Sequence, residues 1–282
     1  MLKRLLFLLI VLSYCYASYG QGKVDAIREA FLNPSPEIVL VAAHRAPHAH
    51  YPENSLKAIE EGVSLGIDIV EIDIKVSKDG VPFLMHDHNL DRTTTGKGEA
   101  EAYTWNELQQ FFLKHEGQIT TLKIPKLEDA LLIAKDHMMV DLDLKTEEIE
   151  DVIRVVNKTN TGKTVIFFES DFSILSRVRS ADTNFLIMPR AHSATEVDSV
   201  ISVFAPPIVH IDFSFYTPEV TQKIAGSSAR IWINALGDVD REIRKGKVNR
   251  AIRILTAHGA NVVQTDEPQQ LLLALRKKGL HP

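Results

Sequence analysis

Short apolar runs alternate with longer amphipathic segments along most of this chain. The runs are rich in Val, Ile, Leu and Phe, residue types that favour β-strands; they occupy eight segments, 38–44, 68–74, 138–144, 164–170, 184–190, 208–214, 230–236 and 261–267. The amphipathic segments place apolar residues three and four positions apart, which predicts helices over 55–66, 127–136, 147–159, 172–180, 194–204, 217–226, 248–259 and 269–278. Eight strand-then-helix units in one domain predict an α/β fold, a closed TIM (β/α)8 barrel, with an open doubly wound sheet as the alternative.

One connection, from Val76 to about Pro125, is too long to be a simple crossover helix. It contains a turn at 78–80, a further apolar run at 81–87, a Thr- and Gly-rich loop at 92–100 and a helix pattern at 104–112. Long insertions in compact domains are usually functional. We therefore expect a small subdomain, about 76–125, inserted after the second strand and lying over the C-terminal face of the barrel.

Polar residues stand where many of the predicted strands end. In a barrel the C-terminal strand ends converge on one face, and that face carries the chemistry. The residues in question are His44, Arg45, Glu71, Asp73, Asp141 to Lys145, Glu169, Arg190, Asp212, Asn234 and Asp266.

The first twenty residues have the pattern of a signal peptide. Lys3 and Arg4 precede an apolar stretch at 5–12, and Ser18 and Gly20 provide small residues before a cleavage site. We expect cleavage after Gly20, export to the periplasm or the medium, and a catalytic domain over 36–282 without stable membrane insertion. An uncleaved membrane anchor is the alternative.

The composition excludes several kinds of site. The chain has 282 residues, 45% hydrophobic and 24% charged, as is ordinary for a soluble globular protein. Cys15 is the single cysteine and would leave with the signal, so disulfides, zinc–thiolate sites and cysteine nucleophiles are excluded from the mature chain. Loss of Lys3 and Arg4 leaves 30 basic against 37 acidic residues, without a basic cluster, and binding of nucleic acid is not expected.

Two pairs of acidic residues have the spacing of one strand face. Glu71 and Asp73 alternate with isoleucines, so both carboxylates point to the same side of a strand that reads as buried. Adjacent carboxylates repel unless a cation lies between them, and oxygen ligands suit Mg²⁺, Ca²⁺ or Mn²⁺. The segment 141–145 repeats the pattern with Asp141, Asp143 and Lys145, although a buried ion pair would look the same.

Five of the eleven histidines lie between His44 and His88, at two predicted strand ends. A histidine beside a metal and a phosphate suits general acid–base catalysis, because its pKa lies near neutral pH. Arg45 offers a guanidinium fork that matches phosphate oxygens. The combination points to phosphoryl transfer. His48, His50 and His88 need have no part in it, and the histidines after His88 are expected to be structural or solvent-facing.

Several ordered motifs resemble those of the glycerophosphodiester phosphodiesterase family. They are HRA at 44–46, PENS at 52–55, EIDIKVSKDGVPFLMHDHNLDRTT at 71–94, PKLEDAL at 125–131, DLDLK at 141–145, WIN at 232–234 and QTDEP at 264–268. The resemblance extends from Val39 to about Leu273. It implies a TIM barrel that hydrolyses small glycerophosphodiesters to sn-glycerol 3-phosphate and an alcohol, with one divalent cation, Mg²⁺ or Ca²⁺.

By the same resemblance, five positions would carry the catalysis and the substrate. His44 and His86 are implied as the acid–base pair. Arg45 and Lys145 would contact the phosphate, and Trp232 would line the pocket near the bound alcohol, although plain core packing is the alternative for this tryptophan.

Five further positions would form the metal site and its surroundings. Glu71, Asp73 and Asp143 are the implied metal ligands, and Glu53 and Asn54 would belong to the metal and substrate neighbourhood.

Two positions depart from the family pattern. Ala46 stands where the family usually has glycine, so we expect a negative φ there and a different path for the first loop. Asp143 replaces the usual, longer Glu, which would draw the metal towards the third strand, admit a water or weaken metal binding. His48 and His50 lengthen the first loop and are candidates for altering substrate selection.

Two other functions stay open on the sequence. One is a related barrel phospholipase acting on intact lipids, which the absence of an apolar membrane-inserting loop disfavours. The other is a non-catalytic barrel kept as a binding protein. Neither the head group of the substrate nor the oligomeric state follows from the sequence.

Overall fold

Eight parallel strands form a nearly closed barrel in the computed structural model, which describes residues 22–35 and 37–281. The neighbouring strands follow the order β8-β7-β6-β2-β1-β11-β10-β9, and a parallel bridge between Arg190 and His210 joins the two ends. The strands are β1 (Leu40–Ala43), β2 (Ile69–Val76), β6 (Met139–Leu144), β7 (Val165–Glu169), β8 (Leu186–Pro189), β9 (Ile208–His210), β10 (Arg230–Asn234) and β11 (Val262–Thr265). The TIM barrel prediction is confirmed.

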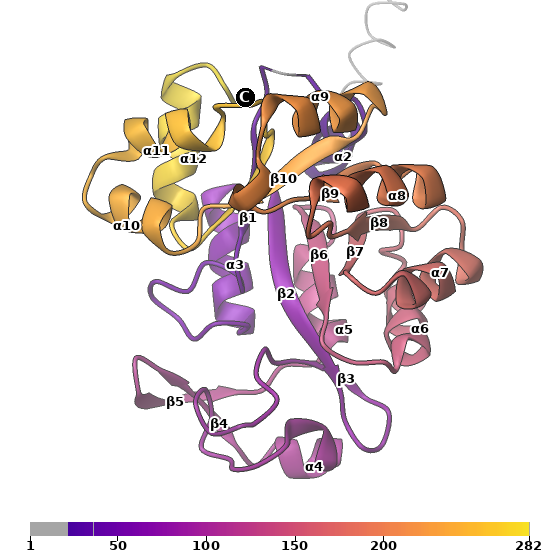
Figure 1. The fold of residues 1–282 in the computed structure, drawn as a ribbon. Helices are drawn as coiled ribbons and strands as arrows, with labels where there is room; N and C mark the ends of the chain where they lie inside the picture. The colour runs from indigo at the N-terminus through magenta and orange to yellow at the C-terminus, as the bar shows by residue number, and fades with distance from the viewer. Residues whose placement is uncertain (1–21, 36, 282) are drawn as a thin grey trace, which may run out of the picture.

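Helices follow the strands and cover the outside of the barrel (Figure 1). They are α3 (Leu56–Leu65), α5 (Leu127–Ala134), α6 (Ile149–Thr159), α7 (Phe172–Ala181), α8 (Ala194–Phe204), α9 (Pro218–Gly226), α10 (Asp238–Arg244), α11 (Val248–Leu255) and α12 (Pro268–Lys277). Local signals set their ends: Ser55 accepts the backbone N–H of Ala58 at the start of α3, and Gly66 ends that helix at φ 76°. Among the described residues, none of the helices is long and apolar enough to cross a membrane.

The strands are buried on both faces, and alternate residues serve two different cores. On β2, Val70, Ile72 and Ile74 belong to the core between the sheet and the helices. Ile69 belongs to a second core, inside the barrel. Glu71 and Asp73 share the face of Ile69 because side chains alternate along a strand. The barrel interior is therefore apolar at its N-terminal end and acidic at its C-terminal end.

A helix that the sequence analysis left unassigned closes the apolar end. In α2 (Lys23–Leu32), Val24, Ile27 and Phe31 pack against the inner residues of the barrel. Arg230, fully buried on β10, donates hydrogen bonds to the carbonyl oxygens of Phe31 (2.9 Å) and Asn261 (3.2 Å), and also to that of Ala30. Burial lowers the pKa of this guanidinium to about 10. The arginine therefore satisfies the last carbonyls of α2 and holds the helix in place.

The expected subdomain after the second strand lies beyond the C-terminal end of β2 (Figure 1). It comprises β3 (Pro82–Leu84), antiparallel to β2, then η1 (Ala100–Ala102), α4 (Trp105–Leu108) and the hairpin of β4 (Phe112–His115) and β5 (Gln118–Lys123). A small core of its own includes Phe83, Leu90 and Leu113.

The helix expected over 104–112 is wrong in its length. It has four residues, although a capping box between Thr104 and Glu107 starts it as the sequence would predict. Phe112 instead pairs with Lys123 in the hairpin, so the strand pairing overrides the local helix preference.

The predicted signal peptide, 1–20, lies outside the described residues.

Candidate active site

Three carboxylates meet at the acidic end of the barrel. Glu71 and Asp73 come from β2 and Asp143 from β6, where Asp73 and Asp143 are register partners. One oxygen from each of the three lies within 4.8 Å of the others. Glu71 and Asp73 are almost completely buried. The structure thus brings together the three residues that were implied as metal ligands.

The electrostatics of this acidic triad favour a cation. Burial, together with Asp73 and Asp143, raises the pKa of Glu71 well above its usual value. Burial and the neighbouring Asp73 raise the pKa of Asp143 against the opposing charge of Lys145. Within the described part of the chain, Glu71 Oε1 and Asp73 Oδ1 are buried without a hydrogen-bond partner. Two such buried oxygens, together with the carboxylate of Asp143, fit a hard divalent cation such as Mg²⁺ or Ca²⁺.

Lys145 adds a positive charge beside the triad. Its Nζ lies 2.7 Å from Asp143 Oδ2 and 3.7 Å from Asp73 Oδ1. Burial would lower the pKa of Lys145, but the attraction of Asp143 and Asp73 outweighs it and the pKa is raised. Lys145 therefore stays an ammonium that can contact an anionic substrate. Asp141, two residues before Asp143 on β6, is also buried, and its pKa is raised by burial and by Asp143.

His44 follows β1 and is held by the carboxylate of Asp266, the residue directly after β11. Its Nδ1 lies 2.7 Å from Asp266 Oδ1. Burial by itself would raise the pKa of Asp266, but the hydrogen bond and the charge of His44 outweigh it, and the pKa lies below its usual value. Since an ionised carboxylate only accepts, Nδ1 carries the proton and Nε2 is left for proton exchange with a substrate. Asp266 is itself anchored, because its backbone N–H donates to Asp240 Oδ2 at 2.9 Å.

The loop after His44 turns through the left-handed region. Arg45 has φ 50° and Ala46 has φ 61°, so the expected negative φ at Ala46 is wrong. The turn directs the backbone N–H of Arg45 to Glu71 Oε2 (2.6 Å) and that of Ala46 to the Glu71 carbonyl (3.0 Å). These two hydrogen bonds hold a conformation that costs a non-glycine residue roughly 1–2 kcal/mol.

Glu53 and Asn54 act on different partners. Glu53 Oε1 accepts a hydrogen bond from Arg45 Nη1 at 3.0 Å. Asn54 donates from Nδ2 to Asp73 Oδ2 at 2.8 Å and accepts the backbone N–H of Asp73 at 3.1 Å. Asn54 therefore fixes one member of the triad, while Glu53 fixes the arginine beside it.

His86 belongs to the inserted subdomain and follows β3. Its Nδ1 lies 2.8 Å from Oδ1 of the next residue, Asp87, again leaving Nε2 free to exchange a proton. Arg92 lowers the pKa of Asp87 and also binds Glu53. The backbone N–H of Met85 donates to the Asp73 carbonyl at 3.0 Å, so His86 stands one residue from a contact with β2, which carries Glu71 and Asp73.

Trp232 is fully buried on β10. Its Nε1 donates to Asn234 Oδ1 at 2.9 Å and to Gln264 Oε1 at 3.3 Å. Its contact with a bound alcohol stays a prediction. Beside it lies His210, buried without a hydrogen-bond partner in the described part of the chain; burial and Arg190 lower its pKa to about 3, so this imidazole is neutral.

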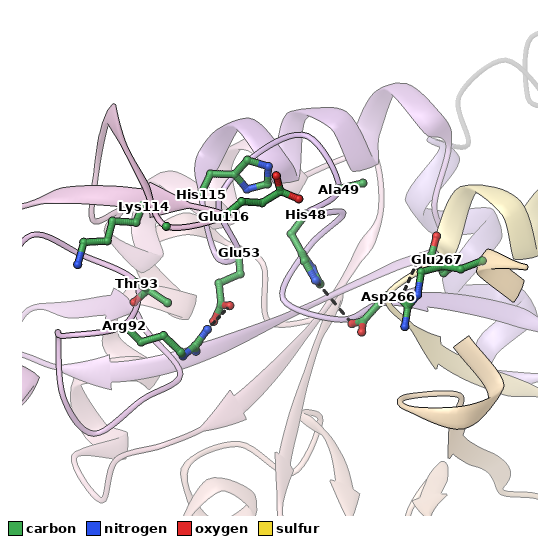
Figure 2. Close-up of a pocket in the computed structure, with 12 residues that line it drawn as sticks. His48, Ala49, Glu53, Arg92, Thr93, Lys114, His115, Glu116, Asp266 and Glu267 are labelled. Carbon is green, nitrogen blue, oxygen red and sulfur yellow. Dashed lines mark hydrogen bonds and ion pairs between the residues drawn. The ribbon is translucent and has the colours of Figure 1, made fainter. Parts of the chain in front are cut away.

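A cavity of about 380 Å³ runs between the inserted subdomain and the barrel. Figure 2 shows Arg92 and Glu53 meeting on one side of it and His48 facing Asp266 on the other. His48 Nδ1 donates to the carbonyl oxygens of His44 and Ala46, both at 3.0 Å. His50 is exposed and pairs with Glu61 instead. His48 thus borders His44 and Asp266, and His50 does not.

Three residues that support the histidines, directly or through another carboxylate, were not predicted in that role: Asp266, Asp87 and Arg92. Asp266 had been noted as a polar strand end, but its contact with His44 could be found only from the barrel order, which pairs β1 with β11. Asp87 stands next to His86, and this adjacency was the available signal. Arg92 lies in a loop whose path the sequence leaves undetermined.

Comparisons with known proteins agree with this geometry. A model of the glycerophosphoryl diester phosphodiesterase family matches residues 44–263. A glycerophosphodiester phosphodiesterase from Caldanaerobacter subterraneus is 23% identical over 260 residues, covering 85% of this chain and 99% of the relative.

Two solved structures have the same fold. A glycerophosphoryl diester phosphodiesterase from Parabacteroides distasonis is 26% identical with a TM-score of 0.77, covering 92% of this chain and 93% of its own. An Oleispira antarctica phosphodiesterase in complex with the product sn-glycerol-3-phosphate is 24% identical with a TM-score of 0.75, covering 85% and 97%. With the matched region spanning most of the chain, this protein belongs to the glycerophosphoryl diester phosphodiesterase family, a family of enzymes.

Proposed function

We propose that the protein hydrolyses glycerophosphodiesters to sn-glycerol 3-phosphate and an alcohol, with one divalent cation in the acidic triad and His44 and His86 as the acid–base pair. One observation carries the proposal. Two histidines, each with a carboxylate on Nδ1, stand one residue from backbone contacts to Glu71 and Asp73. Each of these two carboxylates has a buried oxygen without a hydrogen-bond partner among the described residues. That arrangement supplies proton transfer and charge neutralisation together.

The residues have separate tasks in this proposal. Glu71, Asp73 and Asp143 would hold the cation, which when bound neutralises charge on the phosphate oxygens. Arg45 and Lys145 would bind and orient the phosphate as fixed cations. Since both histidines have Nε2 free, one can take the proton of a nucleophile while the other gives a proton to the departing alcohol.

Two nucleophiles fit these roles. In the first route, a histidine deprotonates the glycerol hydroxyl next to the phosphate, this oxygen attacks phosphorus, and the alcohol leaves with a proton from the other histidine. Water then opens the cyclic phosphate with the histidines in exchanged roles. In the second route, water attacks the diester directly. A substrate analogue without the neighbouring hydroxyl separates them: turnover at the full rate would rule out the cyclic route.

A panel of glycerophosphodiesters tests the function. We expect release of sn-glycerol 3-phosphate with Mg²⁺ or Ca²⁺ and loss of turnover with chelator. The same ions should raise the melting temperature of the wild type by binding the folded state. Glu71→Gln and Asp73→Asn should abolish this rise, because each removes a ligand charge. The proposal fails if no common divalent ion supports turnover of any member of the panel.

We also propose that the protein is exported, on the signal-peptide pattern of residues 1–20. Sequencing the N-terminus of the protein recovered from cells tests this. A start at Gln21 supports export, and a chain that retains Met1 contradicts cleavage.

A further inference from the structure

We infer that Arg92 is a positioning residue, which holds the His86–Asp87 pair of the inserted subdomain and the Glu53–Arg45 pair of the barrel in one fixed arrangement. The inference rests on the proposed roles of His86 and Arg45. In this inference Arg92 acts through the two carboxylates that it binds, Asp87 and Glu53.

The guanidinium of Arg92 binds two carboxylates at once. Nε and Nη2 donate to Asp87 Oδ2 and Oδ1 at 2.6 and 2.8 Å. Nη1 and Nη2 donate to Glu53 Oε2 and Oε1 at 2.7 and 2.8 Å. Both pairs are bidentate, so they fix direction as well as distance.

Each of these carboxylates also binds a residue of the site. Asp87 Oδ1 receives His86 Nδ1 at 2.8 Å, and Glu53 Oε1 receives Arg45 Nη1 at 3.0 Å. The result is an unbroken chain of contacts, His86–Asp87–Arg92–Glu53–Arg45. It connects the imidazole of the insertion to the guanidinium proposed to bind phosphate.

The position of Arg92 argues for orientation rather than stability. Its side chain is 49% exposed, and ion pairs at such exposure contribute only about 0–1 kcal/mol to folding. Asp87 and Glu53 lie on different parts of the fold, the insertion and the loop before α3. Without Arg92, Asp87 would be free to turn away from His86, and the carboxylate of Glu53 would be held by Arg45 alone.

The variants Arg92→Ala and Arg92→Lys test this, with Arg177→Ala as the matched control. Arg177 is also half exposed, 44%, and also binds one carboxylate, Glu150, through two hydrogen bonds, but on α7, away from the site. We expect Arg92→Ala to lower kcat/KM by about 10- to 100-fold, mainly through kcat. The kcat/KM of Arg92→Lys should be about as low as that of Arg92→Ala, because an ammonium keeps the charge but cannot form two bidentate pairs. Both alanine variants should melt at similar temperatures.

Chemical rescue adds a measurement that a purely structural role would not affect. Arg92 borders the 380 Å³ cavity, so free guanidinium can reach the vacated position. Guanidinium chloride at concentrations far below denaturing ones should restore part of the activity of Arg92→Ala. The same addition should not raise the activity of the wild type or of Arg177→Ala. Sodium chloride at an equal concentration should not raise the activity of any of the three proteins.

Three results would overturn the inference. In the first, Arg92→Ala is as active as Arg177→Ala. In the second, Arg92→Lys has full activity. In the third, Arg92→Ala unfolds more easily than the wild type but has wild-type activity per folded molecule. If the wild type itself releases no glycerol 3-phosphate, the proposed function has failed, and the NMR signal of the His86 Nδ1 proton still tests the positioning. We expect that signal to be protected from exchange in the wild type and in Arg177→Ala and lost in Arg92→Ala; its persistence there would contradict the inference.

Discussion

The two histidines of the site are held in different ways. His44 stands on the barrel, and its partner Asp266 lies 222 residues further along the chain, directly after β11, the strand paired with β1. His86 stands on the insertion, and its partner is the next residue, Asp87. Asp266 is anchored to the barrel by Asp240, a fully buried residue, whereas Asp87 is held by the half-exposed Arg92.

The difference shows two ways to place a catalytic group. On the barrel side, the parallel strands alone place His44, the acidic triad and Asp266 close together, because the C-terminal ends of the strands meet on one face. On the insertion side, the side chains of His86, Asp87 and Arg92 are all partly exposed, and ion pairs connect them. We therefore expect the barrel side to tolerate little change at its carboxylate and the insertion side to depend on Arg92.

The largest expected effects are those of the histidines themselves. His44→Ala and His86→Ala should each lower kcat by about 10²- to 10⁴-fold, because each removes one of two proton transfers in the same turnover. The double variant should be little worse than either single one. The measurement is release of glycerol 3-phosphate, with circular dichroism as the check on folding. If one single variant keeps wild-type activity, that side of the site does not carry acid–base catalysis.

The carboxylates behind the histidines should have smaller and unequal effects. We expect Asp266→Asn to lower kcat by about 100-fold and Asp87→Asn by about tenfold, the two ends of the range for such supporting residues. Asp266 is tied through its backbone N–H to the buried Asp240, and asparagine at 266 would no longer compel His44 Nδ1 to hold the proton. Equal losses from the two variants would remove the proposed difference between the two sides.

The barrel side should also be the more sensitive to acid, because of His210. The ordinary pKa of this histidine is 6.5 and burial lowers it to about 3 in the folded chain. Below pH 6.5 the unfolded chain therefore binds a proton that the folded chain does not, and stability is lost as the pH falls from 6.5 towards 3. At pH 5 the loss from this group is about 2 kcal/mol.

Replacing His210 tests this. Between pH 7 and pH 5, the free energy of unfolding measured in urea should fall less for His210→Met than for the wild type. The same slope for His210→Met and the wild type would contradict a buried neutral imidazole.

The smallest effect is expected at the turn after His44. Ala46→Gly relieves a positive φ but removes a buried methyl and gives the unfolded chain more freedom, so its stability should change by less than about 1 kcal/mol. Ala43→Gly, on β1, loses a buried methyl without a positive φ to relieve and should be clearly destabilising. Urea unfolding of the two variants measures the difference, and equal losses would mean that the turn carries no strain.

The fold could be predicted from the sequence because its strands are buried on both faces and its helices have one apolar stripe. The eight units follow from that alternation. The helix α2 could not be assigned from the sequence, because its apolar residues are buried only by contact with the inner residues of the barrel, which the complete fold brings to them. The short α4 could not be bounded, since pairing of Phe112 with Lys123 is a contact between distant segments.

For the site, the strand period was enough to place Glu71 and Asp73 on one face. The positive φ of Ala46 could not be predicted from its type, because two hydrogen bonds to Glu71 impose it. Asp266 and Arg92 were missed for a common reason: each acts on a residue that the fold, and not the sequence, brings near.

The helix α2 has a practical consequence for any attached group. Because Arg230 holds its last carbonyls at the floor of the barrel, the helix joins the enzyme at the end opposite the acidic triad (Figure 1). A fusion partner, an immobilising tag or a tether that enters the chain before Lys23 would therefore sit behind the barrel and leave the entrance for substrates clear.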